Sequence, residues 1–174
     1  MHSLLLVTLE PADDANSESV RQQVYDCLLA DPSICGDGGR FWSAPCDWFV
    51  IGGAWSGLLA ETVMGGEFQA RVRALTGTDG ERLKQSDLER HAADLDALWQ
   101  SLGGTAPNRY LRKDCHDYGH PDDAMLLSQP LYDALLSEHE GQDTDGTSFV
   151  DLDGDEISPG FIGRKWLVVV DYHS

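Results

Sequence analysis

The chain has 174 residues, 41% of them apolar, which is enough for one compact domain with a continuous core or one domain with a large insertion. Its 30 Asp and Glu residues against 12 Lys and Arg give a formal net charge of -18, which argues against direct binding to nucleic acid or to an anionic membrane. No apolar run reaches the roughly 18 to 20 residues that span a bilayer, and the start of the chain lacks a basic segment and a cleavage site, so we expect a cytoplasmic protein.

The N-terminal segment predicts a strand followed by a helix. Ser3–Leu9 is an apolar run of strand length, and its near-continuous apolarity indicates a central strand that is buried on both faces. Between Ser17 and Ala30, apolar residues recur at three- and four-residue spacing, which is typical of a helix packed on a sheet. Ser19 and Gln22 form a candidate capping box at its start.

The middle of the chain predicts two strands and a long helix. Asp47–Ile51 and Ser56–Thr62 look like strands joined through a glycine pair, Gly52-Gly53. A helix is expected over Ser86–Leu102, because Ser86-Asp87-Leu88-Glu89 reads as a capping box and apolar residues then follow along one face.

The last third predicts one more helix, an acidic hairpin and a second central strand. Residues 103–123, rich in Gly, Pro, Asn and Asp, are the expected long surface loop. A short helix follows Ser128, Phe149–Ile157 reads as an acidic β-hairpin turning at Asp153-Gly154, and Trp166–Tyr172 reads as a strand. The predicted fold is α+β or α/β: a single domain over residues 1–174, with one mixed sheet, the terminal strands central, and two or three packed helices.

The segment around the glycine pair is the most distinctive motif. Cys46–Gly57 places two tryptophans, Trp48 and Trp55, on either side of Gly52-Gly53. The glycine spacing matches neither standard nucleotide-binding loop, and no Lys-Ser or Lys-Thr follows, so a tight turn packed by the tryptophans is favoured over a phosphate cradle.

Asp47–Gly57 resembles a loose family of small uncharacterised proteins from bacteria, their phages and prophages. In these proteins an Asp-Trp-Phe or Asp-Trp-Tyr strand runs into Ile-Gly-Gly, a variable position and Trp-Ser-Gly. A second, weaker block of similarity is the acidic hairpin, then Lys165-Trp166 and a C-terminus ending Asp171-Tyr172-His173. The variable position is often Arg in the family but is Ala54 here, so an anion-binding role for that arginine does not carry over. The resemblance implies a mobile-element setting and supplies no catalytic residues.

The sequence contains two sets of possible metal ligands, and neither set predicts a metal site. For zinc, Cys115 and His120 lie five positions apart, and Cys35 with Cys46 would complete a four-ligand set, but closely spaced cysteine pairs are absent, so zinc binding stays open. For calcium, alternate carboxylates occur in Asp143–Gly146 and Asp151–Glu156, but the glycine comes too early for an EF-hand and the distal Glu is missing. We expect no cofactor.

The last third of the chain contains a one-sided charge block. Thirteen Asp and Glu residues fall between Asp114 and Ile162, where no Lys or Arg occurs. Duplex DNA carries one charge per roughly 1.7 Å of axis, so carboxylates on a rigid surface can take its place in a basic groove. The charge predicts DNA mimicry, and the resemblance implies a phage or prophage setting. We therefore expect a phage- or prophage-encoded protein, of unknown oligomeric state, that inhibits a CRISPR effector or similar host defence nuclease. The partner is a basic nucleic-acid-binding protein or complex, and the expected contacts are Asp117, Asp122, Asp123, Glu138, Glu140, Asp143, Asp145, Asp151, Asp153, Asp155 and Glu156.

Two alternatives remain at this point. The chain can instead be a small enzyme or ligand-binding domain with a pocket beside Gly52-Gly53, walled by Trp48 or Trp55 and using Asp47 or His116 as its polar group. It can also be a domain whose acids serve solubility alone, with high-salt adaptation or genomic composition as their cause. Because a cysteine and histidine pair for nucleophilic catalysis cannot be read from the sequence, no catalytic residue is predicted.

Overall fold

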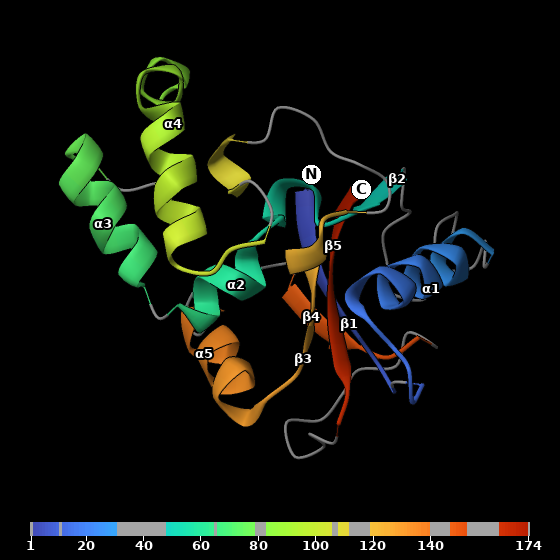
Figure 1. Cartoon of the computed structure of the whole chain (residues 1–174). Coiled ribbons are helices and arrows are strands. Elements are labelled where there is room, and N and C mark those ends of the chain that lie inside the picture. Colours follow the sequence, from blue (N-terminus) through green and yellow to red (C-terminus); the bar gives the residue numbers. More distant parts are fainter. Residues whose placement is uncertain are drawn as a thin grey trace.

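The computed structural model has an α+β fold built on one mixed sheet, as the sequence predicts (Figure 1). It describes residues 2–10, 12–30, 48–64, 66–78, 83–105, 108–111, 119–139, 147–152 and 164–173. The strands are β1 His2–Leu9, β2 Trp48–Ile51, β3 Ala124–Leu126, β4 Thr147–Val150 and β5 Trp166–His173. The helices are α1 Ser17–Ala30, α2 Leu58–Val63, α3 Glu67–Thr76, α4 Gln85–Ser101 and α5 Gln129–His139.

The terminal strands form the centre of the sheet, which confirms the prediction for both ends of the chain. The strand order is β2-β5-β1-β4, and β3 also pairs with β5. β1 runs antiparallel to β5 along its whole length, from His2 opposite His173 to Leu9 opposite Trp166. β4 runs parallel to β1 on its other side. β1 is therefore paired on both sides over Leu4–Val7, and β5 lies between β1 and the edge strands β2 and β3, which suits the apolar composition of both strands.

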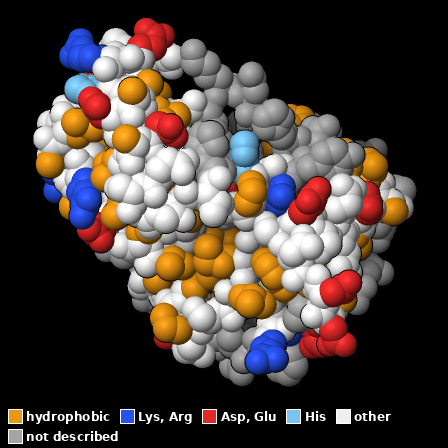
Figure 2. All heavy atoms as spheres, viewed as in Figure 1, with side chains coloured by type: hydrophobic (Ala, Val, Ile, Leu, Met, Phe, Trp, Pro, Cys, Tyr) orange, Lys and Arg blue, Asp and Glu red, His pale blue; other side chains and the backbone are white. Residues whose placement is uncertain are grey.

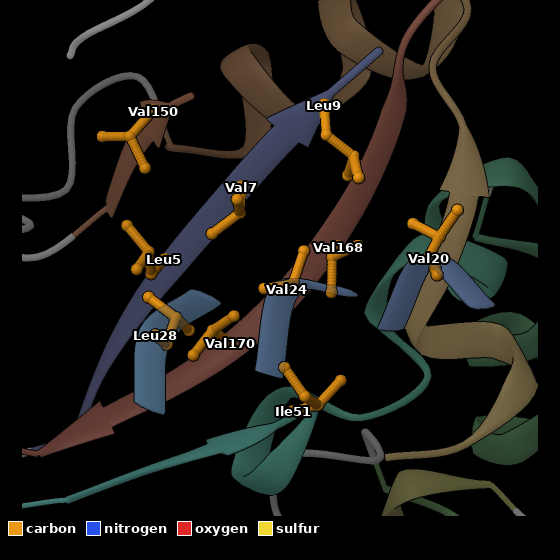
Figure 3. Close-up of a cluster of buried hydrophobic side chains, with 11 residues drawn as sticks. Leu5, Val7, Leu9, Val20, Val24, Leu28, Ile51, Val150, Val168 and Val170 are labelled. Carbon is orange, nitrogen blue, oxygen red and sulfur yellow. The ribbon is translucent and has the colours of Figure 1, made fainter. Parts of the chain in front are cut away.

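Each face of the sheet is covered by helices. Alternate residues of β1 point to opposite faces, so Leu5, Val7 and Leu9 face α1 (Figure 3), while Leu4 and Leu6 face α2 and α5. On the first face, α1 contributes Val20, Val24 and Leu28. On the second face, α2 contributes Leu58 and Leu59, and α5 contributes Leu131, Tyr132 and Leu135. The continuous apolar run of β1 thus follows from burial on two faces.

A helical lobe stands to one side of the sheet (Figure 1). It consists of α2, α3, α4 and the 3-10 helix Arg109–Leu111. Its core is a separate cluster of Ala60, Phe68, Val72, Leu95 and Trp99. The rings of Phe68 and Trp99 meet edge to face with centroids 5.3 Å apart. The lobe therefore buries apolar surface among its own helices, and α2 links it to the sheet.

The prediction for the segment after the glycine pair was wrong. Ser56–Thr62 is not a strand: Gly53–Trp55 forms a 3-10 turn, and Leu58–Val63 is helix α2. Periodicity cannot separate a short apolar run in a strand from one in a buried helix, and here Leu58 and Leu59 face the sheet while Ala60 faces the lobe. Helix α3 was not predicted at all.

The helix ends also differ from the predicted capping boxes. At α1 the reciprocal bonds join Asn16 and Ser19, with Ser19 N donating to Asn16 Oδ1 and Asn16 N to Ser19 Oγ at 3.0 Å each. At α4, the backbone N–H of Lys84 donates to Asp87 Oδ2 at 3.3 Å. Both helices begin before the predicted boxes, so the capping residues move toward the N-terminus.

Two other predicted features fall partly outside the described residues. Phe149 and Val150 lie in β4, which pairs with β1, whereas the turn expected at Asp153-Gly154 lies outside the described part of the chain. Residues 103–123, expected as a surface loop, contain the 3-10 helices Arg109–Leu111 and Pro121–Asp123. Asn108 and Asp123 are both fully buried there.

Candidate functional site

A buried polar cluster lies where β2 ends and β3 begins, and we call it the aspartate joint. Its members are Gly52, Gly53, Ser56, Gly57, Asp123 and Asp171. Gly52 and Gly53 directly follow β2, and Asp123 is the last residue of the 3-10 helix that precedes β3. Since β2 and β3 both pair with β5, the two glycines and Asp123 meet at the middle of this sheet edge. Asp123 and Asp171 are both fully buried, which is rare for carboxylates unless they are bonded.

Both oxygens of Asp123 accept hydrogen bonds. Oδ1 accepts from the backbone N–H of Gly57 at 2.9 Å, and Oδ2 accepts from the backbone N–H of His120 at 2.7 Å. The Ser56 hydroxyl lies 2.6 Å from each oxygen and donates to the carboxylate. The carboxylate therefore ties the turn after the glycine pair to the segment that leads into β3.

The glycine at position 52 is required by both space and backbone conformation. Gly52 has φ of 75°, where side chains are disfavoured. A Cβ placed there would lie 2.2 Å from Asp123 Oδ2 and 2.7 Å from Ser56 Oγ. The missing side chain thus lets the backbone approach the buried carboxylate.

Asp171 provides a second buried attachment. It sits within β5, where its neighbours in the strand are apolar, and its Oδ2 accepts from the backbone N–H of Ala54 at 2.8 Å. A Cβ on Gly53 would lie 2.3 Å from the Cβ of Asp171. The turn that follows β2 is therefore packed directly onto the central strand.

Arg21 of α1 places a positive charge near the joint. Its side chain is 7% exposed, and its Nε donates to the carbonyl oxygen of Ser17 at 3.1 Å. Burial lowers the pKa of the Arg21 guanidinium, while the negative charges of Asp123 and Glu18 oppose that shift. The Ser17 hydroxyl donates to the carbonyl oxygen of Pro121 at 2.6 Å, so α1 is attached to the same region.

The geometry of the joint suits a structural role. Ser56 is 1% exposed and its hydroxyl is directed to Asp123, so it is not presented to a substrate as a nucleophile. The backbone of Gly52 and Gly53, where a ligand would approach, is already packed against Asp123 and Asp171. This packing disfavours a ligand pocket at the glycine pair.

Asp122 and Asp123 are not surface contact residues, so their prediction was wrong. Asp123 is fully buried, and Asp122 is 7% exposed and bonded to Thr105, whose backbone N–H lies 3.2 Å from Asp122 Oδ2. The Thr105 hydroxyl also donates to Asp122. The local density of acidic residues suggested that both side chains are exposed. Hydrogen bonds from backbone N–H groups that are distant in the chain, those of Thr105 and Gly57, instead allow both carboxylates to be buried.

The remaining predicted contacts are mostly outside what the structure describes. Asp151, after β4, is half-buried. The side chains of the other predicted contacts are not among those described: Asp117, Glu138, Glu140, Asp143, Asp145, Asp153, Asp155 and Glu156. Their role as contact residues on one surface therefore stays a prediction.

The residues named for the alternative pocket and for zinc are also only partly described. Trp48 is 40% exposed, and Trp55 is half-buried. Asp47 and His116 lie outside the described residues, as do the possible zinc ligands Cys35, Cys46 and Cys115. Among the described side chains, no group of three or more His, Cys, Asp or Glu is arranged to hold a metal ion.

An acidic surface that was not predicted from the sequence lies along α1 and the turn before it. We call it the α1 acidic surface; its members are Glu10, Asp13, Asp14, Glu18 and Asp26, all exposed. Arg21 is the one basic residue of the first 39 positions, and it is buried beneath the helix. Figure 2 shows red side chains on the side of the molecule where α1 lies.

The described helices show no membrane span, because none of them is both long and apolar enough. Comparisons with known proteins found no matching family model, no similar curated protein and no similar solved structure.

Proposed function

We propose that this protein is an acidic interaction protein that binds a basic, nucleic-acid-binding protein or complex in place of nucleic acid. The observation that carries this proposal is the unbalanced charge: the net charge is -18, and within residues 10–30 all five carboxylates are exposed while Arg21 is buried. An excess of exposed negative charge raises the association rate with a basic surface and repels nucleic acid.

The burial of Arg21 is important for this surface. An exposed arginine at that position would neutralise part of the charge of Glu18 and the other carboxylates around it. Instead, its Nε is bonded to Ser17 and its charge faces Asp123 at the joint. The helix thus shows carboxylates to solvent and keeps its cation inside, which supports binding to a partner rich in Lys and Arg.

A host defence nuclease such as a CRISPR effector is the specific partner that we propose. This choice rests on the resemblance of Asp47–Gly57 to phage and prophage proteins. The acids between Asp114 and Ile162 would supply a second negative region, since no Lys or Arg occurs among them. Inhibition would follow because a groove that is occupied by carboxylates cannot hold DNA.

The alternative of a pocket beside the glycine pair has less support. Asp123 and Asp171 fill the space next to Gly52 and Gly53, and both carboxylates accept backbone hydrogen bonds. We therefore propose that Asp47–Gly57 organises the fold rather than binding a small molecule.

The proposal is tested by capture from a bacterial lysate on the immobilised protein, with duplex DNA as competitor. We expect retained proteins to bind nucleic acid, to be released by DNA, and to lose affinity at least about tenfold between 50 and 500 mM salt. Retention that neither DNA nor salt affects would contradict the proposal.

Charge reversal locates the binding surface. Changing Asp13, Asp14, Glu18 and Asp26 together to Lys should abolish retention. The matched control changes four exposed acids of α3 and α4 to Lys: Glu67, Glu89, Asp94 and Asp96. The control should keep most of the retention, because these acids stand among exposed basic residues. Equal loss from both variants would mean that net charge alone, and not the α1 acidic surface, governs binding.

A further inference from the structure

β2 and β3 occupy one line along the edge of the sheet. Both run antiparallel to β5: Trp48–Ile51 lies opposite His173 to Val170, and Ala124–Leu126 lies opposite Val168 to Trp166. Between them a single residue of β5, Val169, is left, and the backbone N–H of Gly52 donates to its carbonyl oxygen at 2.7 Å. Residues 48–52 and 124–126 therefore follow β5 without a gap or a change of direction, although the chain departs between them.

We infer that residues 53–123 are an insertion into one edge strand, closed by the carboxylate of Asp123, and that its helices α3 and α4 open locally as a unit while the sheet and the α2 residues packed on it stay folded. The shared register is the first support. A one-residue shift would turn the β3 side chains to the opposite face of the sheet, yet Ile51 and Ala124 both join the core under α1. The two half-strands thus behave as one strand that has been interrupted after Gly52.

The second support is the position of the bonds made by Asp123. Asp123 is the last inserted residue, and Ser56 and Gly57 lie in the first turn of the insertion. One side chain therefore ties the entry of the insertion to its exit. The bond from Ala54 to Asp171 attaches the same turn to β5. Breaking the Asp123 bonds would release both ends of the insertion while leaving the β1 and β5 ladder intact.

The third support is the separate core of the helical lobe. Phe68 packs on Trp99 and stacks on Tyr110, with ring centroids 6.2 Å apart in the second pair. Asn108 Nδ2 donates to the buried Glu61 Oε1 at 3.0 Å, which joins α2 to the segment before Arg109–Leu111. A core this small is less stable than the two-faced core of the sheet, so α3 and α4 should open more readily than the sheet unfolds.

Native-state hydrogen exchange of the full chain tests this inference. We expect backbone amides of α3 and α4 to exchange at least about tenfold faster than those in the middle of β1 and β5, by a local opening. The substitution Leu28→Ala removes a buried side chain from the core between α1 and the sheet. It should therefore speed exchange in β1 and β5 by about thirtyfold or more. Amides in α3 and α4 should change less than about threefold, because their opening leaves Leu28 packed.

Several outcomes would overturn the inference. Equal protection of the lobe and the central strands in the unchanged protein would show one cooperative unit, as would an equal effect of Leu28→Ala on both. If Leu28→Ala does not fold, the milder Val24→Ala serves the same purpose.

The conservative Asp123→Asn should speed exchange in α3 and α4 by about tenfold or more, whereas Asp133→Asn, at an exposed site, should not. No effect of Asp123→Asn on the lobe would show that its carboxylate does not close the insertion.

Discussion

Along the helices of the lobe, exposed acids alternate with exposed bases, whereas along α1 and the turn before it every exposed charged side chain is acidic. The exposed bases of the lobe region are Arg71, Arg73, Lys84 and Arg90, and its exposed acids include Glu67, Glu89, Asp94 and Asp96. Figure 2 shows red and blue side chains together over α3 and α4. The α1 acidic surface has no exposed base among its neighbours in sequence. Solubility does not require a one-sided arrangement of charge, which is why we propose the α1 acidic surface as the interaction surface.

The two regions also differ in what stabilises them. The sheet depends on apolar residues from β1 and β5 packed on both faces, and the lobe on a few aromatic and aliphatic side chains. Between them, the aspartate joint depends on buried charge and hydrogen bonds. Substitutions at the joint should therefore cost more stability than substitutions on the surface of either region.

The largest effect is expected from Asp123→Ala. The change leaves the N–H groups of Gly57 and His120 without their acceptor and removes the anion that faces Arg21. Loss of one partner of a buried charged network costs about 3 to 5 kcal/mol, and we expect that decrease in the free energy of unfolding from urea denaturation. The control Asp133→Ala, at an exposed position of α5, should cost less than about 1 kcal/mol. Similar costs for the two variants would contradict the structural role of the joint.

A smaller but still large effect is expected from Gly52→Ala, with Gly66→Ala as its control. Both glycines have positive φ, 75° and 78°, so both substitutions strain the backbone. At Gly66 nothing lies within 4 Å of the new Cβ, whereas at Gly52 the Cβ meets Asp123 at 2.2 Å. We expect about 1 kcal/mol at Gly66 and about 3 kcal/mol at Gly52, measured by thermal or urea denaturation. Equal costs would mean that close packing on Asp123 adds nothing to the strain.

The sequence predicted the helices and strands that are determined by the pattern of apolar residues within one segment. α1 and α4 follow from apolar spacing, and the central place of β1 and β5 follows from continuous apolar runs. α2 was missed because its apolar run is short, and α3 because only Phe68 and Val72 are buried and charged residues interrupt its apolar pattern. Helix propensity and periodicity are weak signals in segments of that length.

The aspartate joint could not be predicted because it brings together residues that are far apart in the chain. Gly52 and Asp123 are separated by the whole insertion, and charge density alone placed Asp122 and Asp123 on the surface. Two signals pointed toward it. The glycine pair indicated a close backbone approach, and Asp171 interrupts an otherwise apolar strand, which is typical of a buried carboxylate with a bonded partner.

The smallest effect is expected from Glu67→Gln on the exposed face of α3. Glu67 Oε1 and Arg71 Nη2 lie 2.6 Å apart, and both side chains are about half exposed, at 52% and 53%. Water and salt screen such a pair, so its loss should lower the free energy of unfolding by less than about 0.5 kcal/mol, and the difference should vanish in 1 M salt. A cost near that of Gly52→Ala would show that surface charge pairs stabilise the lobe as strongly as the buried joint, and would remove the contrast between the two regions.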